Sequence, residues 1–224
     1  MLGTLLRKDG LAIAGGTMLL YTSVYFFERG YCSQLNIPLD YIEITIPTIV
    51  NDVLNSIFFI LIISLTSLGI MSKGKKNGFR GWHAFAPAYC WLVYTGITFF
   101  IMEHTWVNLF LSTFLGGIYF LQFMPATYIA KGNENLITLQ SRTLDYAGAL
   151  FLVSMTFTIY GQFYAKGSTF DIYTQNGKQY ELLKVYGENI FMREIEDEKN
   201  PTKVTYFNAQ NMTGMTLSQE KSKK

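Results

Sequence analysis

The stretch VLNSIFFILIISLTSLGIMS, from Val53 to Ser72, contains no charged residue and is followed at once by the basic segment Lys73-Gly74-Lys75-Lys76. A helix rises about 1.5 Å per residue, so this stretch reaches roughly 30 Å, the thickness of the hydrocarbon core of a bilayer. Because Lys and Arg accumulate on the cytoplasmic side of transmembrane helices, the basic segment predicts that this end of the span is cytoplasmic. The stretch therefore predicts a membrane protein.

The composition agrees with this prediction. Of the 224 residues, 50% are hydrophobic and only 15% are charged, whereas an average soluble chain is about 25% charged. The mean hydropathy of +0.19 averages an apolar first part with a polar part after residue 166. The two cysteines make neither a disulfide framework nor a metal site; Cys32 is expected in a short loop, and Cys90 is expected to be a small buried residue of an apolar span.

Four further uncharged stretches resemble the first. Together they predict a multi-pass domain over residues 1–166, with five transmembrane helices near residues 10–27, 53–72, 84–102, 105–130 and 146–165. Polar segments separate the spans, namely a polar turn at residues 28–40, a basic loop at 73–80, a tight turn at 103–104 and a polar loop at 131–142. Pro47 removes a backbone donor, which predicts a helix start or a kink before the second span.

Charge divides these segments into two sets. One set carries Arg7, Lys8, Lys73, Lys75, Lys76, Arg80, Lys131 and Arg142, whereas the other carries Arg29 as its one basic residue beside Glu28, Asp40, Glu43, Asp52 and Glu103. The positive-inside rule therefore predicts a cytoplasmic N-terminus. Five spans would put the C-terminal domain outside, whereas a re-entrant or interfacial segment among them would move it to the cytoplasm.

The pattern changes after residue 166. Stretches rich in β-branched and aromatic residues, although imperfectly alternating, predict strands at Thr169 to Thr174, Gln179 to Tyr186, Ile190 to Ile195 and Lys203 to Asn208. Asn176-Gly177 and the segment beginning at Gly187 are typical hairpin turns. We therefore expect a small all-β domain at residues 167–217, with a polar loop at 196–201 and a disordered tail at 218–224.

The sequence contains no recognisable catalytic constellation. His83 and His104 are predicted at opposite membrane faces, and there is no glycine-rich phosphate loop and no zinc-protease or serine-hydrolase motif. Basic and acidic residues are nearly balanced after Lys166, which does not indicate a nucleic-acid surface. We therefore predict a protein that is not an enzyme and needs no cofactor.

Polar residues gather on one helical face at the start of the second span. The pore-lining candidates are Thr48, Asp52, Asn55, Ser56, Phe59 and Ile63. Spacings of three and four residues place them on one face, polar at its outer end with an apolar constriction at Phe59 and Ile63. A carboxylate favours cations and an apolar constriction can gate by dewetting, so the face is typical of a pore. The alternative is that these hydroxyls and amides join helices, with Asp52 in the headgroup region.

Two further features concern helix contacts. Small residues permit close helix packing, and the spans contain Gly15-Gly16, Gly69, Gly96 and Gly116-Gly117. Glu28 with Arg29, at the end of the first span, predicts either an interface couple, exposed or paired, or a solvated helix end.

Two stretches carry a resemblance to a known group of proteins. FFERGYCSQLNIPLDYIEI, from Phe26 to Ile44, follows the first span, and YELLKVYGENIF, from Tyr180 to Phe191, reads as strand, turn and strand. In this arrangement the chain resembles small multi-pass bacterial inner-membrane proteins with a C-terminal β module, and it is similar in plan to membrane effectors of anti-phage defence systems such as Hailong. The resemblance implies a bacterial cytoplasmic membrane and oligomerisation into a gated pore, and it assigns no functional residue.

These observations predict an all-α membrane bundle followed by a small all-β domain. The predicted function is a homo-oligomeric pore or ion-channel-like effector, gated or assembled through the C-terminal domain. The alternative is a non-conducting membrane scaffold whose C-terminal domain binds a protein partner. The expected partners are the lipid bilayer, further copies of the chain, and a ligand or protein at the C-terminal domain.

Overall fold

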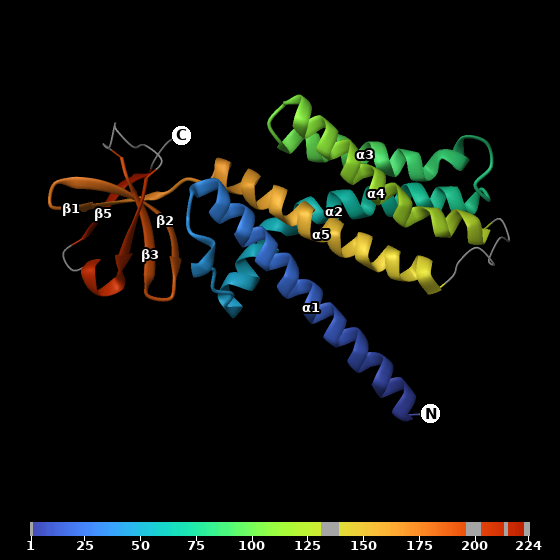
Figure 1. Cartoon of the computed structure of the whole chain (residues 1–224), viewed down its shortest axis with the longest axis horizontal. Helices are drawn as coiled ribbons and strands as arrows, with labels where there is room; N and C mark the ends of the chain where they lie inside the picture. Colours follow the sequence, from blue (N-terminus) through green and yellow to red (C-terminus); the bar gives the residue numbers. More distant parts are fainter. Residues whose placement is uncertain (1, 131–138, 196–202, 213–214, 222–224) are drawn as a thin grey trace. The chain divides into compact units, whose positions relative to one another are not determined.

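The fold is a set of long helices followed by a small antiparallel sheet (Figure 1). The structure, a computed structural model, describes residues 2–130, 139–195, 203–212 and 215–221. The helices are α1 (Leu2–Leu35), α2 (Ile46–Lys76), α3 (Ala86–Ile101), α4 (Trp106–Ala130) and α5 (Leu139–Gly167). The strands are β1 (Asp171–Gln175), β2 (Lys178–Tyr186), β3 (Asn189–Glu194), β4 (Val204–Asn208) and β5 (Thr216–Lys221). At this level the predicted fold class is confirmed.

Three segments within the described residues are long and apolar enough to cross a membrane: Ile46–Lys76, Gly81–Ile101 and Trp106–Phe123. The first contains the stretch at residues 53–72, and the other two match the predicted third and fourth spans. The predicted spans at residues 10–27 and 146–165 lie within α1 and α5, and the count of five spans stays a prediction.

The chain forms two compact units. One unit, which we call the terminal unit, comprises residues 1–49 and 160–224, and the other, the helical unit, comprises residues 50–159. The predicted domain boundary between residues 166 and 167 therefore does not coincide with the boundary between the units, because α1 and the end of α5 belong with the sheet.

In the helical unit, the core lies where α2, α3, α4 and α5 meet. Ile63, Tyr94, Leu115 and Leu152 come from these four helices and are each at most 7% exposed. The rings of Tyr94 and Tyr119 stack with centroids 4.7 Å apart, which joins α3 to α4. A second cluster surrounds Cys90, which is fully buried as predicted.

The terminal unit begins where the sequence predicts a turn. The predicted polar turn at residues 28–40 is wrong over its first part, because α1 continues to Leu35. The cause is apolar spacing: Val24, Phe27, Tyr31 and Leu35 recur every three or four residues and are all buried, so one face of the helix continues past the predicted end of the span. Cys32 therefore lies on α1 and not in a loop.

This face of α1 packs against the sheet. Tyr31, Cys32 and Leu35 share a core with buried residues of β2 and β3, among them Leu183 and Phe191. Near the same end, α5 approaches α1 closely, because a Cβ at Gly161 would lie 2.1 Å from the carbonyl oxygen of Phe27. The core of the sheet is therefore completed by two helices.

The sheet is wholly antiparallel, in the order β4-β3-β2-β1-β5. Both predicted hairpin turns are confirmed: Asn176 and Gly177 have φ of 52° and 78° between β1 and β2, and Gly187 has φ of 56° between β2 and β3. Positive φ at both central residues of the first turn, and at the first central residue Gly187 of the second, matches the right-handed twist of the flanking strands. The four predicted strands correspond to β1 to β4.

The fifth strand was not predicted. Asp171 and Tyr173 of β1 pair with Lys221 and Leu217 of β5, so the predicted disordered tail at 218–224 is wrong for residues 218–221. The predicted loop at 131–142 is helical from Leu139 onward. Its remainder, the predicted loop at 196–201 and residues 222–224 lie outside the described residues.

Candidate functional site

The polar face predicted on α2 is turned into the molecule. Asp52 and Ser56 are each 2% exposed and Ile63 is 7% exposed, whereas Phe58, on the other side of the helix, is 74% exposed. The helical period accounts for this, since residues 52, 56, 59 and 63 follow one another by three or four positions. The face is therefore covered by the chain itself, and the exposed side of α2 is apolar.

Several polar groups of this face form hydrogen bonds within the helix. The Ser56 hydroxyl donates to the carbonyl oxygen of Asp52 at 2.7 Å, and the amide of Asn51 donates to the Asp52 carboxylate at 3.4 Å. Asn55 is half-buried beside them. Thr48 lies in the first turn, where its amide donates to the Thr45 hydroxyl at 3.4 Å, so Thr45 begins the helix with a side-chain cap.

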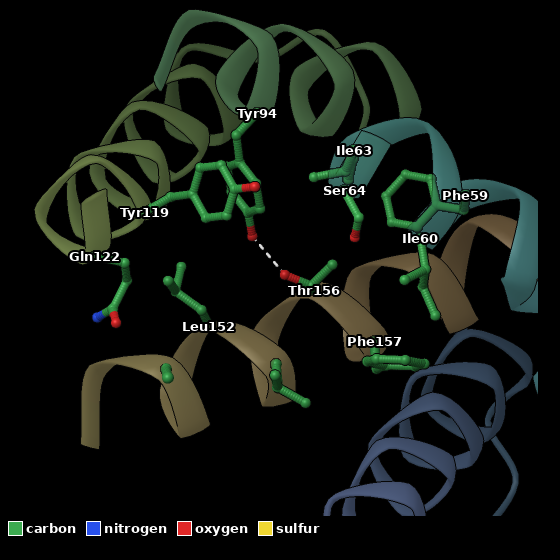
Figure 2. Close-up of a pocket in the computed structure, with 12 residues that line it drawn as sticks. Phe59, Ile60, Ile63, Ser64, Tyr94, Tyr119, Gln122, Leu152, Thr156 and Phe157 are labelled. Atoms are coloured by element: carbon green, nitrogen blue, oxygen red, sulfur yellow. Dashed lines mark hydrogen bonds between the residues drawn. The ribbon is translucent and has the colours of Figure 1, made fainter. Parts of the chain in front are cut away.

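Phe59 and Ile63 line a cavity of the helical unit. The cavity has a volume of ≈ 320 Å³ and lies between α2, α3, α4 and α5 (Figure 2). Its walls are largely apolar, with Leu152 and Phe157 of α5 opposite Phe59 and Ile63. Of the predicted pore-lining set, the structure brings these two residues to the cavity, whereas Thr48, Asp52, Asn55 and Ser56 are not among its lining residues.

A few polar groups converge on the same cavity from four helices. Ser64 comes from α2, Tyr94 from α3, Gln122 from α4 and Thr156 from α5, and the hydroxyls of Tyr94 and Thr156 are 2.5 Å apart (Figure 2). Tyr119 also lines the cavity and donates to the Ser67 hydroxyl at 2.8 Å. The described lining holds no charged side chain. An apolar cavity with convergent neutral polar groups has the form of a small-molecule site.

The terminal unit contains a second polar cluster. Glu28 of α1 is fully buried. Its carboxylate accepts a hydrogen bond from the Tyr186 hydroxyl and forms an ion pair with Lys184, whose Nζ is 2.5 Å away. The Cys32 sulfur is 3.0 Å from the same Tyr186 hydroxyl, and Lys184 lies over the ring of Tyr31 with Nζ 4.9 Å from its centroid. Of the two predictions for Glu28, the solvated helix end is wrong.

A β-bulge directs two members of this cluster toward α1. In β2, Glu181 and Leu183 are buried, and after a register shift between Leu182 and Lys184 the inward positions become Lys184 and Tyr186. A bulge inserts one residue and so moves the following side chains to the other face of the strand. Without this inserted residue, Lys184 and Tyr186 would point away from Glu28.

The cluster favours neutral tyrosines. Burial, and next the negative charge of Glu28, raise the pKa of Tyr186 above its usual value of 10.0. The same two causes, in the same order, raise the pKa of Tyr31. Both hydroxyls therefore remain protonated donors across the physiological range, and Tyr31 donates to the carbonyl oxygen of Leu183 at 3.2 Å.

Neither the cavity nor the Glu28 cluster is among the sites that the sequence predicts. The cavity depends on residues far apart in the chain, for which no local pattern exists. For the cluster a signal was present, namely the broken alternation in the stretch from Glu181 to Tyr186, which is typical of a bulge. Within the described residues, no group of three or more His, Cys, Asp or Glu side chains gathers as a metal site would require.

The fold and these two sites define a class: a helical protein with a C-terminal antiparallel sheet built onto its first helix and, in the described part of the chain, three helices able to cross a membrane. No family model matches the chain, and neither a curated protein nor a solved structure matches it.

Proposed function

We propose that the chain is a channel-like membrane protein in which the inward side of α2 carries an ion path and the terminal sheet controls it. The observation that carries the proposal is the burial of Asp52, a carboxylate at the beginning of α2, which has no other charged residue before Lys73. Ionisable groups at membrane depth are costly, and they commonly belong to ion pathways. A path along this face passes Phe59 and Ile63, which form an apolar constriction of the kind that gates by dewetting.

The proposal differs in one respect from a pore formed between copies of α2. Asp52, Ser56 and Ile63 are buried by their own chain, so the path follows the interior of each protomer. The exposed apolar side of α2, which includes Phe58 and Leu65, is available for lipid or for a second copy in a homo-oligomer. Control by the sheet is supported by the ion pair between Lys184 of β2 and Glu28 of α1, because a movement of the sheet would pull on that helix.

Flux through liposomes containing the purified chain tests the proposal. We expect cation flux from the wild type, and we expect Asp52→Asn to lower cation selectivity by at least about fivefold, since one charge at 4 Å contributes about 1 kcal/mol in water and more where burial reduces screening. Phe59→Ala should increase leak, whereas Phe58→Ala, a neighbouring phenylalanine that is 74% exposed, should not. Asp40→Asn, an exposed carboxylate, is the control for Asp52.

A second candidate is a non-conducting scaffold that binds a protein through the sheet. It is favoured by the edge strand β5, where Leu217 is 60% exposed, because an edge strand with an exposed apolar side chain is a site for pairing with another chain. Absence of flux from intact, correctly assembled protein would favour this candidate. A role in anti-phage defence, expected from the resemblance, stays a prediction that phage challenge of cells carrying the chain tests.

A further inference from the structure

The cavity of the helical unit has the size and lining of a ligand site. At ≈ 320 Å³ it is about twice the volume of a cavity of roughly 150 Å³ that accepts benzene, which corresponds to a ligand of roughly ten to fifteen non-hydrogen atoms. Helices α3 and α4 pack closely along their lengths, whereas α2 and α5 do not pack on each other in this way. The space is therefore bounded by side chains of α2 and α5, among them Phe59 and Phe157.

The lining also defines the chemistry of the ligand. The aromatic rings of Phe59, Tyr94, Tyr119 and Phe157 favour an aromatic or flat apolar body. Because the described lining has no charged side chain, an ionic ligand would lose its hydration without gaining a counter-charge. The ligand is therefore neutral and apolar over most of its surface.

The hydroxyl pair of Tyr94 and Thr156 requires a polar group as well. Two hydroxyls in one hydrogen bond use one donor hydrogen, and the second hydrogen and the remaining lone pairs stay available for a third group. The Ser64 hydroxyl points into the same space (Figure 2). A hydrocarbon chain such as a lipid tail would leave the remaining hydroxyl hydrogen of the Tyr94–Thr156 pair unused, which costs binding energy.

We propose that this cavity binds a neutral, mostly aromatic small molecule that carries one hydroxyl-type hydrogen-bonding group, held between Phe59 and Phe157 with its polar end at Thr156 and Tyr94. The site stands whether or not the chain conducts ions, because binding is measured at equilibrium. A ligand at Phe59 and Ile63 would also occupy the constriction of the proposed ion path.

The test measures binding of 2-naphthol, a neutral two-ring probe with one hydroxyl, to the full chain in nanodiscs, with empty nanodiscs as the background. We expect saturable binding with one site per chain. Thr156→Val preserves the shape of the side chain and removes the hydroxyl, so it should weaken binding about three- to tenfold, the effect of one neutral hydrogen bond. Thr158→Val is the matched control, because the Thr158 hydroxyl donates to the Ser154 carbonyl oxygen at 2.8 Å and does not line the cavity.

Further outcomes decide the role of the cavity itself. Ala149→Phe introduces a ring at the cavity wall and should abolish saturable binding, while helical content by circular dichroism reports whether this variant folds. Naphthalene, which lacks the hydroxyl, should bind about three- to tenfold more weakly than 2-naphthol. The proposal is overturned if the wild type shows no saturable binding, if Thr156→Val and Thr158→Val bind equally, or if decane competes as well as 2-naphthol does.

Discussion

Glu28 shows how one buried charge can connect a predicted membrane helix to a sheet. Its carboxylate is fully buried, forms an ion pair with Lys184 of β2 and accepts a hydrogen bond from the Tyr186 hydroxyl of the same strand. A buried carboxylate is costly unless a counter-charge and hydrogen bonds compensate for the lost water. The two partners satisfy that requirement, so the cluster is expected to specify how α1 and β2 meet and to be sensitive to the loss of either partner.

Lys184→Met should destabilise the terminal unit by about 3 kcal/mol, the low end of the range for breaking a buried ion pair, since the Lys184 side chain is itself 20% exposed. Thermal unfolding in detergent measures this loss. Adding Glu28→Gln to Lys184→Met should recover part of the stability, because the uncompensated charge is removed. Lys178→Met is the matched control: Lys178 pairs with Glu194 at 2.7 Å but is 59% exposed, so it should cost less than about 1 kcal/mol. Equal losses from Lys184→Met and Lys178→Met would contradict the argument.

Tyr186 should give the terminal unit a pH dependence in the alkaline range. Its pKa in the folded protein is raised above 10.0, so the unfolded state releases the phenolic proton first. The contribution of Tyr186 to stability is therefore fully present below about pH 10 and is lost as pH rises above that value, by at most about 1.4 kcal/mol per pH unit. Between pH 8 and 11, the free energy of unfolding should fall more steeply with pH for the wild type than for Tyr186→Phe. Tyr180→Phe, on the same strand, should retain the steeper wild-type slope.

At the scale of the elements, the sequence predicted what local periodicity determines. The uncharged stretch at residues 53–72 predicted the middle of α2, and Asn176-Gly177 predicted the first hairpin. The end of α1 was missed because charge at Glu28 and Arg29 was interpreted as the end of a helix, whereas the buried spacing of Phe27, Tyr31 and Leu35 continued it. That burial depends on contact with the sheet, which no local pattern reveals.

The close-packing glycines illustrate the same limit. Of those predicted to permit helix contact, Gly116 does so, since a Cβ there would lie 2.1 Å from the Thr95 hydroxyl oxygen. A Cβ at Gly15, Gly69 or Gly96 would have no described atom within 4 Å. A glycine permits a close helix contact only where another helix lies beside it. The sequence alone therefore could not distinguish Gly116 from the glycines without such a contact.

Gly161→Ala tests the closest helix approach in the terminal unit. The added methyl group would lie 2.1 Å from the Phe27 carbonyl oxygen and 3.0 Å from the Tyr31 amide nitrogen, and backbone atoms cannot move aside as a flexible side chain can. We expect a loss of about 2 kcal/mol, typical of overpacking, or roughly 4–8 °C in thermal unfolding for a chain of this size. Gly167→Ala, on the same helix, meets no described atom within 4 Å and should change the midpoint little. A midpoint for Gly161→Ala equal to that of Gly167→Ala would exclude the close approach in the membrane.

At the scale of the whole molecule, the terminal unit constrains the topology more strongly than charge does. Tyr31 and Leu35 at the end of α1, Ala165 near the end of α5 and Leu183 of the sheet share one core. These segments must therefore lie on one side of the membrane. If α1 crosses the bilayer, its end and the sheet are opposite the N-terminus. The chain from the end of α1 to the end of α5, with α5 included, must then make an even number of crossings.

The three segments able to span a membrane between α1 and α5, Ile46–Lys76, Gly81–Ile101 and Trp106–Phe123, sharpen this requirement. Three crossings from the end of α1 lead to the opposite face, and α5 must then cross as well to return to the sheet. The shared core thus links the crossing of α5 to the crossing of these three segments, through a contact that charge patterning does not use, and the crossing of α1 stays a prediction.

Reporters of sidedness at three positions test this topology. With the cytoplasmic N-terminus that the positive-inside rule predicts, a reporter at Lys224 should report the outer side, a reporter inserted after Lys75 the cytoplasm, and a reporter at Glu103 the outer side. A cytoplasmic signal at Lys224 together with a cytoplasmic signal at Lys75 would contradict this topology, because the sheet and the end of α1 would then lie on the same side as Lys75 and α2 would not cross.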